Sequence, residues 1–222
     1  MRTAIFDLDG TLADTSADLV TAANATLAEA GIAAALDKRR DRATAMQGGR
    51  AMLRLALGRL GRPDDALIDR LYPRLLAHYG DCLDAETRLF EGVEATLAAL
   101  SGSDWRLGIC TNKPQALAEA LIASLGLAGT FHALIGADLL AVRKPDPFHL
   151  TETIRRAGGE PSRAVLVGDT ITDLNAARAA GMPCILVRFE AETVAALAPD
   201  AFIAHYDELP ALLEALVPAV PA

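Results

Sequence analysis

The sequence of 222 residues contains few aromatic side chains, few cysteines and no basic run. Aromatic residues make up only 5% of the chain although hydrophobic residues make up 52%, so the core must be built from Ala, Leu, Ile and Val. The formal net charge of −8 argues against nucleic acid or an anionic membrane surface as a partner. The three cysteines, Cys82, Cys110 and Cys184, lack metal-ligand spacing. We interpret them as free, buried thiols in a reducing compartment.

Long hydrophobic runs are also missing. The longest charge-free run, residues 120–137, is interrupted by glycines and polar residues, which is typical of a helix, a loop and a strand rather than a membrane span. The apolar stretch between Arg2 and Asp7 is too short for a signal peptide. We therefore expect a soluble, cytoplasmic protein, monomeric or homodimeric, with no membrane or nucleic-acid partner.

Helical periodicity dominates the chain between residues 15 and 85. Apolar residues recur at helical spacing in three segments, 16–30, 50–60 and 64–79. Ser16 is expected to cap the first of these helices. No strand signal is visible in this part of the chain. The sequence therefore predicts a small all-helical domain over residues 15–85, inserted into a core formed by residues 1–14 and 86–222.

Strands and helices alternate in the rest of the chain. Five apolar segments are predicted to be strands: 1–6, 105–110, 133–136, 164–168 and 184–187. Helices are predicted between them and after them at 93–100, 115–125, 147–157 and 172–180. Such alternation with continuously apolar strands indicates an α/β fold, with a Rossmann-like, mostly parallel sheet covered on both faces. We make no assignment between residues 187 and 209.

Two acidic side chains follow the first strand directly. Asp7 and Asp9 are two residues apart, so an extended chain places both carboxylates on one side. At an effective dielectric of about 20, two like charges 4 Å apart cost roughly 4 kcal/mol. A solvated Asp-Gly turn remains an alternative, but it gains nothing from this repulsion. A site that binds a cation and needs both a nucleophile and an acid/base would use both groups.

Polar side chains also follow three later strands. Thr111 and Asn112 end one strand, Lys144 lies just past another, and Asp169 with Asp173 follows a third. Each has a structural alternative, since the first pair and Asp169 could cap helices and Lys144 could be a surface lysine. In an open α/β sheet, however, ligands bind beyond the carboxyl ends of the strands. Together these side chains therefore predict one site.

The residue types in this site match a single task. Carboxylates with backbone oxygens form a hard oxygen cage suited to Mg²⁺. A hydroxyl, an amide and an ammonium group are donors that fit phosphate oxygens. One carboxylate can attack phosphorus, and a second can protonate the leaving group.

The set resembles the four motifs of haloacid dehalogenase superfamily phosphatases. The motifs are Asp7-Leu8-Asp9-Gly10-Thr11-Leu12, Thr111-Asn112, Lys144-Pro145 and Gly168-Asp169-Thr170-Ile171-Thr172-Asp173. The resemblance spans residues 3 to about 190, with the motifs in the same order. Within the superfamily the chain most resembles phosphoglycolate phosphatases, through the residues that flank these motifs.

This resemblance implies a magnesium-dependent hydrolase of small phosphorylated metabolites that works through an aspartyl-phosphate. Asp7 would be the nucleophile and Asp9 the general acid/base. Thr111 and Asn112 would hold the transferring phosphoryl group. Lys144 would stabilise its negative charge and restrain Asp7.

The resemblance also implies a metal site and a cap. Mg²⁺ would be bound by Asp7, the backbone oxygen of Asp9 and Asp169, with Asp173 holding Asp169 or a water on the metal. The helical insert would be a mobile cap over the substrate. Its loop departs from the family pattern, because Gln47 stands where a glycine is usual.

Two cap residues remain candidates for substrate contact. They are Gly49 and Arg50, and Arg50 could bind a substrate carboxylate or be a solvated first-turn arginine. A phosphosugar mutase, a pyrophosphatase and a nucleotidase of the same superfamily remain alternatives, as does a non-catalytic phosphate-sensing module. The second carboxylate, Asp9, argues against a dehalogenase, whose halide leaving group needs no proton.

Overall fold

The structure is a computed structural model that describes residues 1–33, 35–187 and 197–219. The chain forms two compact units, Met1–Ala13 with Leu89–Ala222 and Asp14–Arg88. The insert expected from the sequence, 15–85, falls inside the second unit. Among the described residues, no helix combines the length and apolar character needed to cross a membrane.

A six-stranded parallel sheet forms the first unit. The strand order is β5-β4-β1-β6-β7-β8, and every neighbouring pair is parallel. The bounds are β1 Arg2–Phe6, β4 Trp105–Cys110, β5 Ala133–Ile135, β6 Ala164–Gly168, β7 Cys184–Val187 and β8 Ala201–Ile203. The predicted α/β fold is confirmed, and β1 lies in the middle of the sheet although it comes first in the chain.

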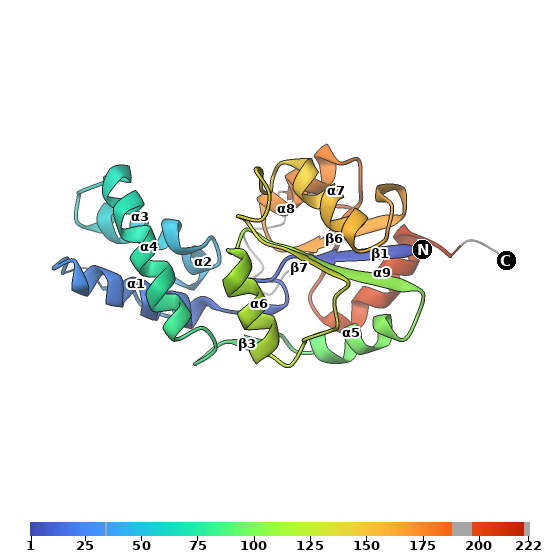
Figure 1. The fold of residues 1–222 in the computed structure, drawn as a ribbon, viewed down its shortest axis with the longest axis horizontal. Helices are drawn as coiled ribbons and strands as arrows, with labels where there is room; N and C mark the ends of the chain where they lie inside the picture. The colour runs from blue at the N-terminus through green and yellow to red at the C-terminus, as the bar shows by residue number, and fades with distance from the viewer. Residues whose placement is uncertain (34, 188–196, 220–222) are drawn as a thin grey trace. The chain divides into compact units, whose positions relative to one another are not determined.

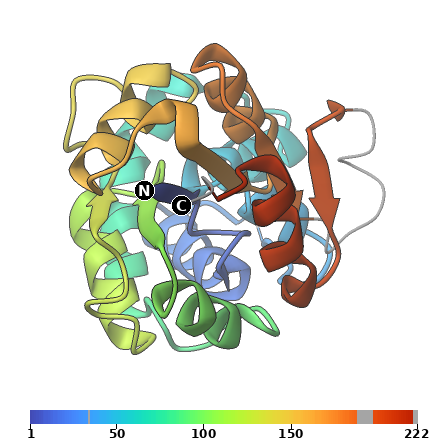
Figure 2. The ribbon, with the colours of Figure 1, turned by 90° about the vertical axis from the view of Figure 1, so that its right-hand side faces the viewer.

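Helices cover both faces of this sheet (Figures 1 and 2), with α7 and α8 on one face and α5 and α9 on the other. The bounds are α5 Val93–Ser101, α6 Gln115–Ser124, α7 Pro147–Arg156, α8 Ile171–Ala179 and α9 Leu209–Leu216, with short 3-10 helices at Pro161–Arg163 and Tyr206–Glu208. All residues of β1, β6 and β7 are buried, as expected for strands covered on both sides. The unassigned part of the sequence contains β8; residues 188–196 lie outside the described residues.

The second unit is helical. It contains α1 Ser16–Glu29, α2 Arg42–Ala45, α3 Gly49–Arg59 and α4 Asp65–Asp81, while two short strands, β2 Ala13–Asp14 and β3 Arg88–Leu89, pair at its ends. The helix α2 was not expected from the sequence. The expectation that Ser16 caps α1 is wrong, because Ser16 is its first helical residue. The Asp14 carboxylate instead accepts hydrogen bonds from the backbone N–H and hydroxyl of Ser16, at 3.1 and 2.6 Å.

Candidate active site

Asp7 stands at the carboxyl end of β1, in the centre of the sheet. Its N–H donates to the carbonyl of Val167 at 2.9 Å and so extends the pairing of β1 with β6 by one residue. Its Oδ1 accepts from the N–H of Leu8 at 2.7 Å, and its Oδ2 lies 3.0 Å from Nζ of Lys144. The carboxylate is therefore held on both oxygens, and 13% of the side chain remains exposed.

The turn after Asp7 brings the first motif against Asp169. Gly10 has φ +80°, and a Cβ there would clash with the Asp169 carboxylate, so glycine is needed for both conformation and space. The hydroxyl of Thr11 donates to Asp169 Oδ1 at 2.9 Å. The carbonyl of Thr11 accepts from the Tyr206 hydroxyl at 2.7 Å. The first motif contains Thr11, but the motif pattern predicts no role for it in the site, and no sequence pattern indicates Tyr206.

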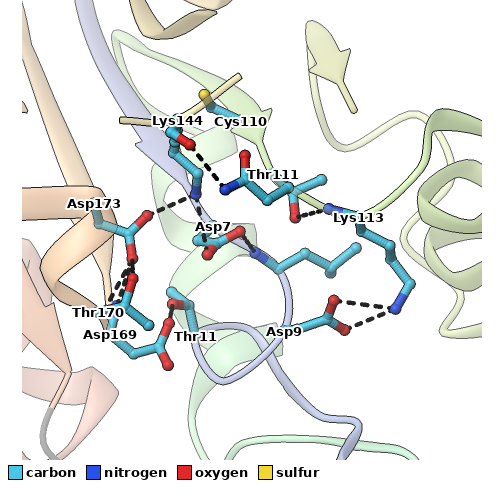
Figure 3. A network of polar contacts seen from close by, with 12 residues as sticks. Asp7, Asp9, Thr11, Cys110, Thr111, Lys113, Lys144, Asp169, Thr170 and Asp173 are labelled. Carbon is cyan, nitrogen blue, oxygen red and sulfur yellow. Dashed lines mark hydrogen bonds and ion pairs between the residues drawn. The ribbon is translucent and has the colours of Figure 1, made fainter. Parts of the chain in front are cut away.

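Lys144 is buried between two carboxylates, as Figure 3 shows. Its Nζ lies 3.0 Å from Asp7 Oδ2 and 2.6 Å from Asp173 Oδ1. Burial alone would lower the pKa of this ammonium, but Asp173 and Asp7 outweigh burial and raise the pKa above its ordinary value. The side-chain amide of Asn112 donates to the Lys144 carbonyl at 3.0 Å and so supports its backbone. Lys144 is thus a buried ammonium group, and the surface-lysine alternative is wrong.

Asp173 supports the site from the first turn of α8. Thr170 is the N-cap of this helix, so the alternative in which Asp169 caps it is wrong. Asp173 Oδ2 accepts from the N–H and hydroxyl of Thr170 at 3.0 and 2.7 Å. The bond from the Thr170 N–H and a reciprocal bond from the Asp173 N–H to the Thr170 side chain form a capping box. Asp173 Oδ1 accepts from Lys144. Both oxygens of this fully buried carboxylate are therefore occupied by protein donors.

Three carboxylates crowd together at this end of the sheet. Oxygens of Asp7, Asp169 and Asp173 lie within 4.8 Å of one another. Burial and the charge of Asp173 outweigh Lys144 and raise the pKa of Asp7 from 3.8 to about 6. Burial, Asp173 and Asp7 likewise raise the pKa of Asp169 well above its ordinary value. The group thus has more negative charge than its lysine balances, and its oxygen donors fit a hard divalent cation such as Mg²⁺.

Asp9 lies apart from this group. Its two carboxylate oxygens are 2.8 and 3.1 Å from Nζ of Lys113, and Figure 3 shows the carboxylate directed toward Lys113. The Lys113 N–H donates to the hydroxyl of the buried Thr111 at 3.2 Å. Lys113 is not among the site residues expected from the sequence, although its place next to Thr111 and Asn112 at a strand end is a signal for it.

The two candidate cap residues begin α3 in the second unit. Gly49 is buried, and a Cβ there would clash with Leu75 of α4. Arg50 forms an ion pair with Asp69, and its guanidinium stacks over the Tyr72 ring, 4.3 Å from the ring centre. The Arg50 head group therefore has partners within its own unit.

The chain belongs to the haloacid dehalogenase-like hydrolase family. The family model matches residues 4–187, which include every strand-end residue described above. The family expected from the four motifs is therefore confirmed, and the protein is identified as a hydrolase of this class.

Within the family the chain is similar to phosphoglycolate phosphatases. It is 44% identical over 220 residues to the Agrobacterium fabrum enzyme, covering 96% of this chain and 93% of that one. It is 43% identical over 208 residues to the Mesorhizobium japonicum enzyme, covering 92% and 91%. Among solved structures, CbbY from Rhodobacter sphaeroides in complex with phosphate matches with a TM-score of 0.75 and 25% identity, covering 94% of this chain and 96% of that chain.

Proposed function

We propose that this protein is a magnesium-dependent phosphomonoesterase of small phosphorylated metabolites, with 2-phosphoglycolate as its first candidate substrate. The observation that carries the proposal is the position of Asp7, held by Lys144 beside Asp169 and Asp173 at the centre of the sheet edge. Two relatives with more than 40% identity over most of both chains are phosphoglycolate phosphatases, which supports the substrate.

In the first half of the reaction Asp7 attacks the phosphorus of the substrate. A bond forms between a carboxylate oxygen of Asp7 and phosphorus, and the ester P–O bond breaks. Asp9 gives its proton to the departing alkoxide. The products of this half are an alcohol and an acyl phosphate on Asp7.

In the second half water replaces Asp7 on phosphorus. Asp9, now a carboxylate, takes a proton from the water as its oxygen attacks. The acyl P–O bond breaks, inorganic phosphate leaves and the Asp7 carboxylate returns. Lys144 and the Thr111 hydroxyl stabilise the negative charge on the phosphoryl oxygens. Asn112 contributes its backbone rather than its side chain, because its side-chain amide already donates to the Lys144 carbonyl.

Asp7, Asp169 and the backbone oxygen of Asp9 would hold Mg²⁺, which supplies Lewis-acid stabilisation of the phosphoryl charge. Asp173 would act through its neighbours, because both of its oxygens already accept hydrogen bonds from Lys144 and Thr170. The raised pKa values of Asp7 and Asp169 support a cation at this place, since a cation would relieve the crowding of charge.

The helical unit would act as the cap and exclude water. Arg50 would meet the substrate carboxylate only after exchanging its partner Asp69 for that ligand. A cytoplasmic location, small-molecule substrates and a monomeric or homodimeric state complete the proposal.

The experiment is phosphate release from a panel of phosphorylated metabolites that includes 2-phosphoglycolate. Turnover should require Mg²⁺, stop with EDTA and be lost in Asp7→Asn. Retention of activity in Asp7→Asn would contradict the mechanism. A preference for a nucleotide or for pyrophosphate would indicate a nucleotidase or a pyrophosphatase instead. Transfer of the phosphoryl group to a sugar phosphate would indicate the mutase. Ligand-induced stabilisation without phosphate release would indicate a sensing module.

A further inference from the structure

Three of the four acidic side chains of the site are paired with two lysines. Lys144 lies against Asp7 and Asp173, whereas Lys113 lies against Asp9. The two lysines reach the site from different loops, because Lys113 follows β4 and Lys144 precedes α7. The Lys113 side chain is 3% exposed and the Asp9 side chain 20%, so the pair is largely shielded from water.

We propose that Lys113 is a positioning residue that holds the Asp9 carboxylate on the leaving-group side of the site. The inference rests on the proposed phosphatase function and assigns to Lys113 a role in proton donation to the leaving group. Its basis is the contact of both Asp9 oxygens with one buried ammonium group, 2.8 and 3.1 Å away.

The chemistry requires such a separation. In phosphoryl transfer the attacking and leaving oxygens lie roughly in line through phosphorus, so the nucleophile and the acid must stand on opposite sides. Asp9 is only two residues from Asp7, and without a second anchor its carboxylate could turn into the cation-binding group of Asp7 and Asp169. Lys113 prevents this by binding Asp9 at both oxygens, and the contact of its own backbone with Thr111 fixes the start of its side chain.

The test compares leaving groups. An alkyl phosphate such as 2-phosphoglycolate releases a strongly basic alkoxide, whereas p-nitrophenyl phosphate releases a weakly basic phenolate that needs little proton donation. General acid catalysis contributes about 10²- to 10⁴-fold, and losing the position of the acid should cost part of this, about 30-fold. We expect Lys113→Met to lower kcat/KM by that factor for 2-phosphoglycolate, or for the best alkyl phosphate of the panel, and by less than about threefold for p-nitrophenyl phosphate.

Two further measurements separate positioning from other roles. In an Asp9→Asn background, adding Lys113→Met should lower kcat/KM by less than about twofold, because the two residues act as a unit. Lys113→Arg, which can also contact both carboxylate oxygens, should restore most of the alkyl phosphate activity. Lys38→Met, which removes a lysine from an exposed ion pair with Glu86 in the other unit, is the matched control and should leave both substrates unaffected.

Two results would overturn the inference. If Lys113→Met lowered kcat/KM equally for both substrates, Lys113 would have a structural role or would bind the phosphoryl group directly. Direct binding would also raise KM. A full effect of Lys113→Met in the Asp9→Asn background would show that Lys113 does not act through Asp9. Should Lys113→Met lose its cooperative thermal transition, Lys113→Gln takes its place in the same comparisons. Failure of the proposed function is distinct, because wild-type protein would then lack Asp7-dependent phosphate release.

Discussion

Buried carboxylates occur in both units, but their partners and their pKa values differ. In the helical unit Asp18 accepts hydrogen bonds from the N–H groups of Glu86 and Thr87 and from the Thr87 hydroxyl, at 2.8 to 3.0 Å. Asp41, in the same unit, is bound by the guanidinium of Arg59, which holds its pKa below the ordinary range. In the sheet unit Asp7 and Asp169 have raised pKa values although Lys144 is close by.

This difference separates stabilising carboxylates from functional ones. Each of these two carboxylates of the helical unit has hydrogen-bond donors of its own, and the depressed pKa of Asp41 means that its charge favours the folded state. In the sheet unit Asp7 and Asp173 share the ammonium group of Lys144, and burial and mutual repulsion raise the pKa values of Asp7 and Asp169, so the charge of these two carboxylates opposes folding until a cation arrives. Crowding of this kind is typical of sites where charge is needed for chemistry rather than for stability.

The largest effect is expected from Asp7→Asn. The amide cannot act as the nucleophile, so turnover should fall by at least about 10³-fold. The metal-free variant should nevertheless melt at a higher temperature than wild type, because one crowded charge is removed without changing the side-chain volume. Phosphate release tests the predicted loss of turnover, and thermal melting in EDTA tests the predicted gain in stability. A variant that is less stable than wild type would contradict the charge argument.

Replacing Lys144 by methionine should harm both activity and stability. The variant leaves Asp173 fully buried without its ammonium partner, and breaking a buried ion pair costs about 3–5 kcal/mol. The proposed role at the phosphoryl group predicts that kcat falls more than KM rises, because the charge on the phosphoryl oxygens grows in the transition state.

Denaturant unfolding and steady-state kinetics test this prediction for Lys144. The control is Arg54→Met, which removes an exposed ion pair with Asp65 and should change stability by less than about 0.5 kcal/mol. A Lys144→Met variant that changed KM alone would contradict the transition-state role.

Asp41→Asn should affect stability alone. The buried carboxylate loses its charge while Arg59, whose side chain is 35% exposed, remains partly solvated, so we expect a loss of about 2 kcal/mol. Because the folded pKa of Asp41 is depressed, its stabilisation is present above the unfolded pKa and is lost as pH falls. The difference in stability between wild type and variant should therefore shrink as pH falls from 7 to 3, and phosphatase activity per folded molecule should stay unchanged.

The sheet and most of the site could be predicted because their signals are local. The strands β6 and β7 are continuous apolar runs, and β1 and β4 are apolar at most positions. Parallel strands place their carboxyl ends at one edge, which brings Asp7 and Asp169 together. The β8 strand has three residues, two of them only partly buried, and gave no comparable pattern.

The remaining parts depend on contacts between distant residues. The spacing of Asp7 and Asp9 indicated a shared side of the chain, but the turn at Gly10 and the ammonium of Lys113 direct the second carboxylate elsewhere. The Tyr206 hydroxyl reaches Thr11 across 195 residues, a contact that no local pattern could indicate.

The smallest expected effect is the change in stability that Mg²⁺ causes at different pH values. Its pH dependence can be compared directly between the two units. The raised pKa values of Asp7 and Asp169 mean that the folded, metal-free protein binds protons more tightly than the unfolded chain. The contribution of these two carboxylates to the stability of the protein should therefore fall as pH rises from about 4 to 6, whereas the contribution of Asp41 rises with pH. Mg²⁺ binds the deprotonated carboxylates, so its stabilising effect should grow over the same interval.

At a fixed concentration ten times its dissociation constant at pH 7, Mg²⁺ should stabilise the protein at that pH by about 1.4 kcal/mol, which is a rise in Tm of about 3–5 °C. Calorimetry with and without Mg²⁺ at several pH values measures this rise, and Asp169→Asn should reduce it while Asp41→Asn should not. An equal rise at pH 4.5 and pH 7, or one that survives in Asp169→Asn, would mean that the crowded carboxylates do not form the cation site. The contrast between the two units would then lose its functional meaning, because excess negative charge at the sheet edge would have no ligand to balance it.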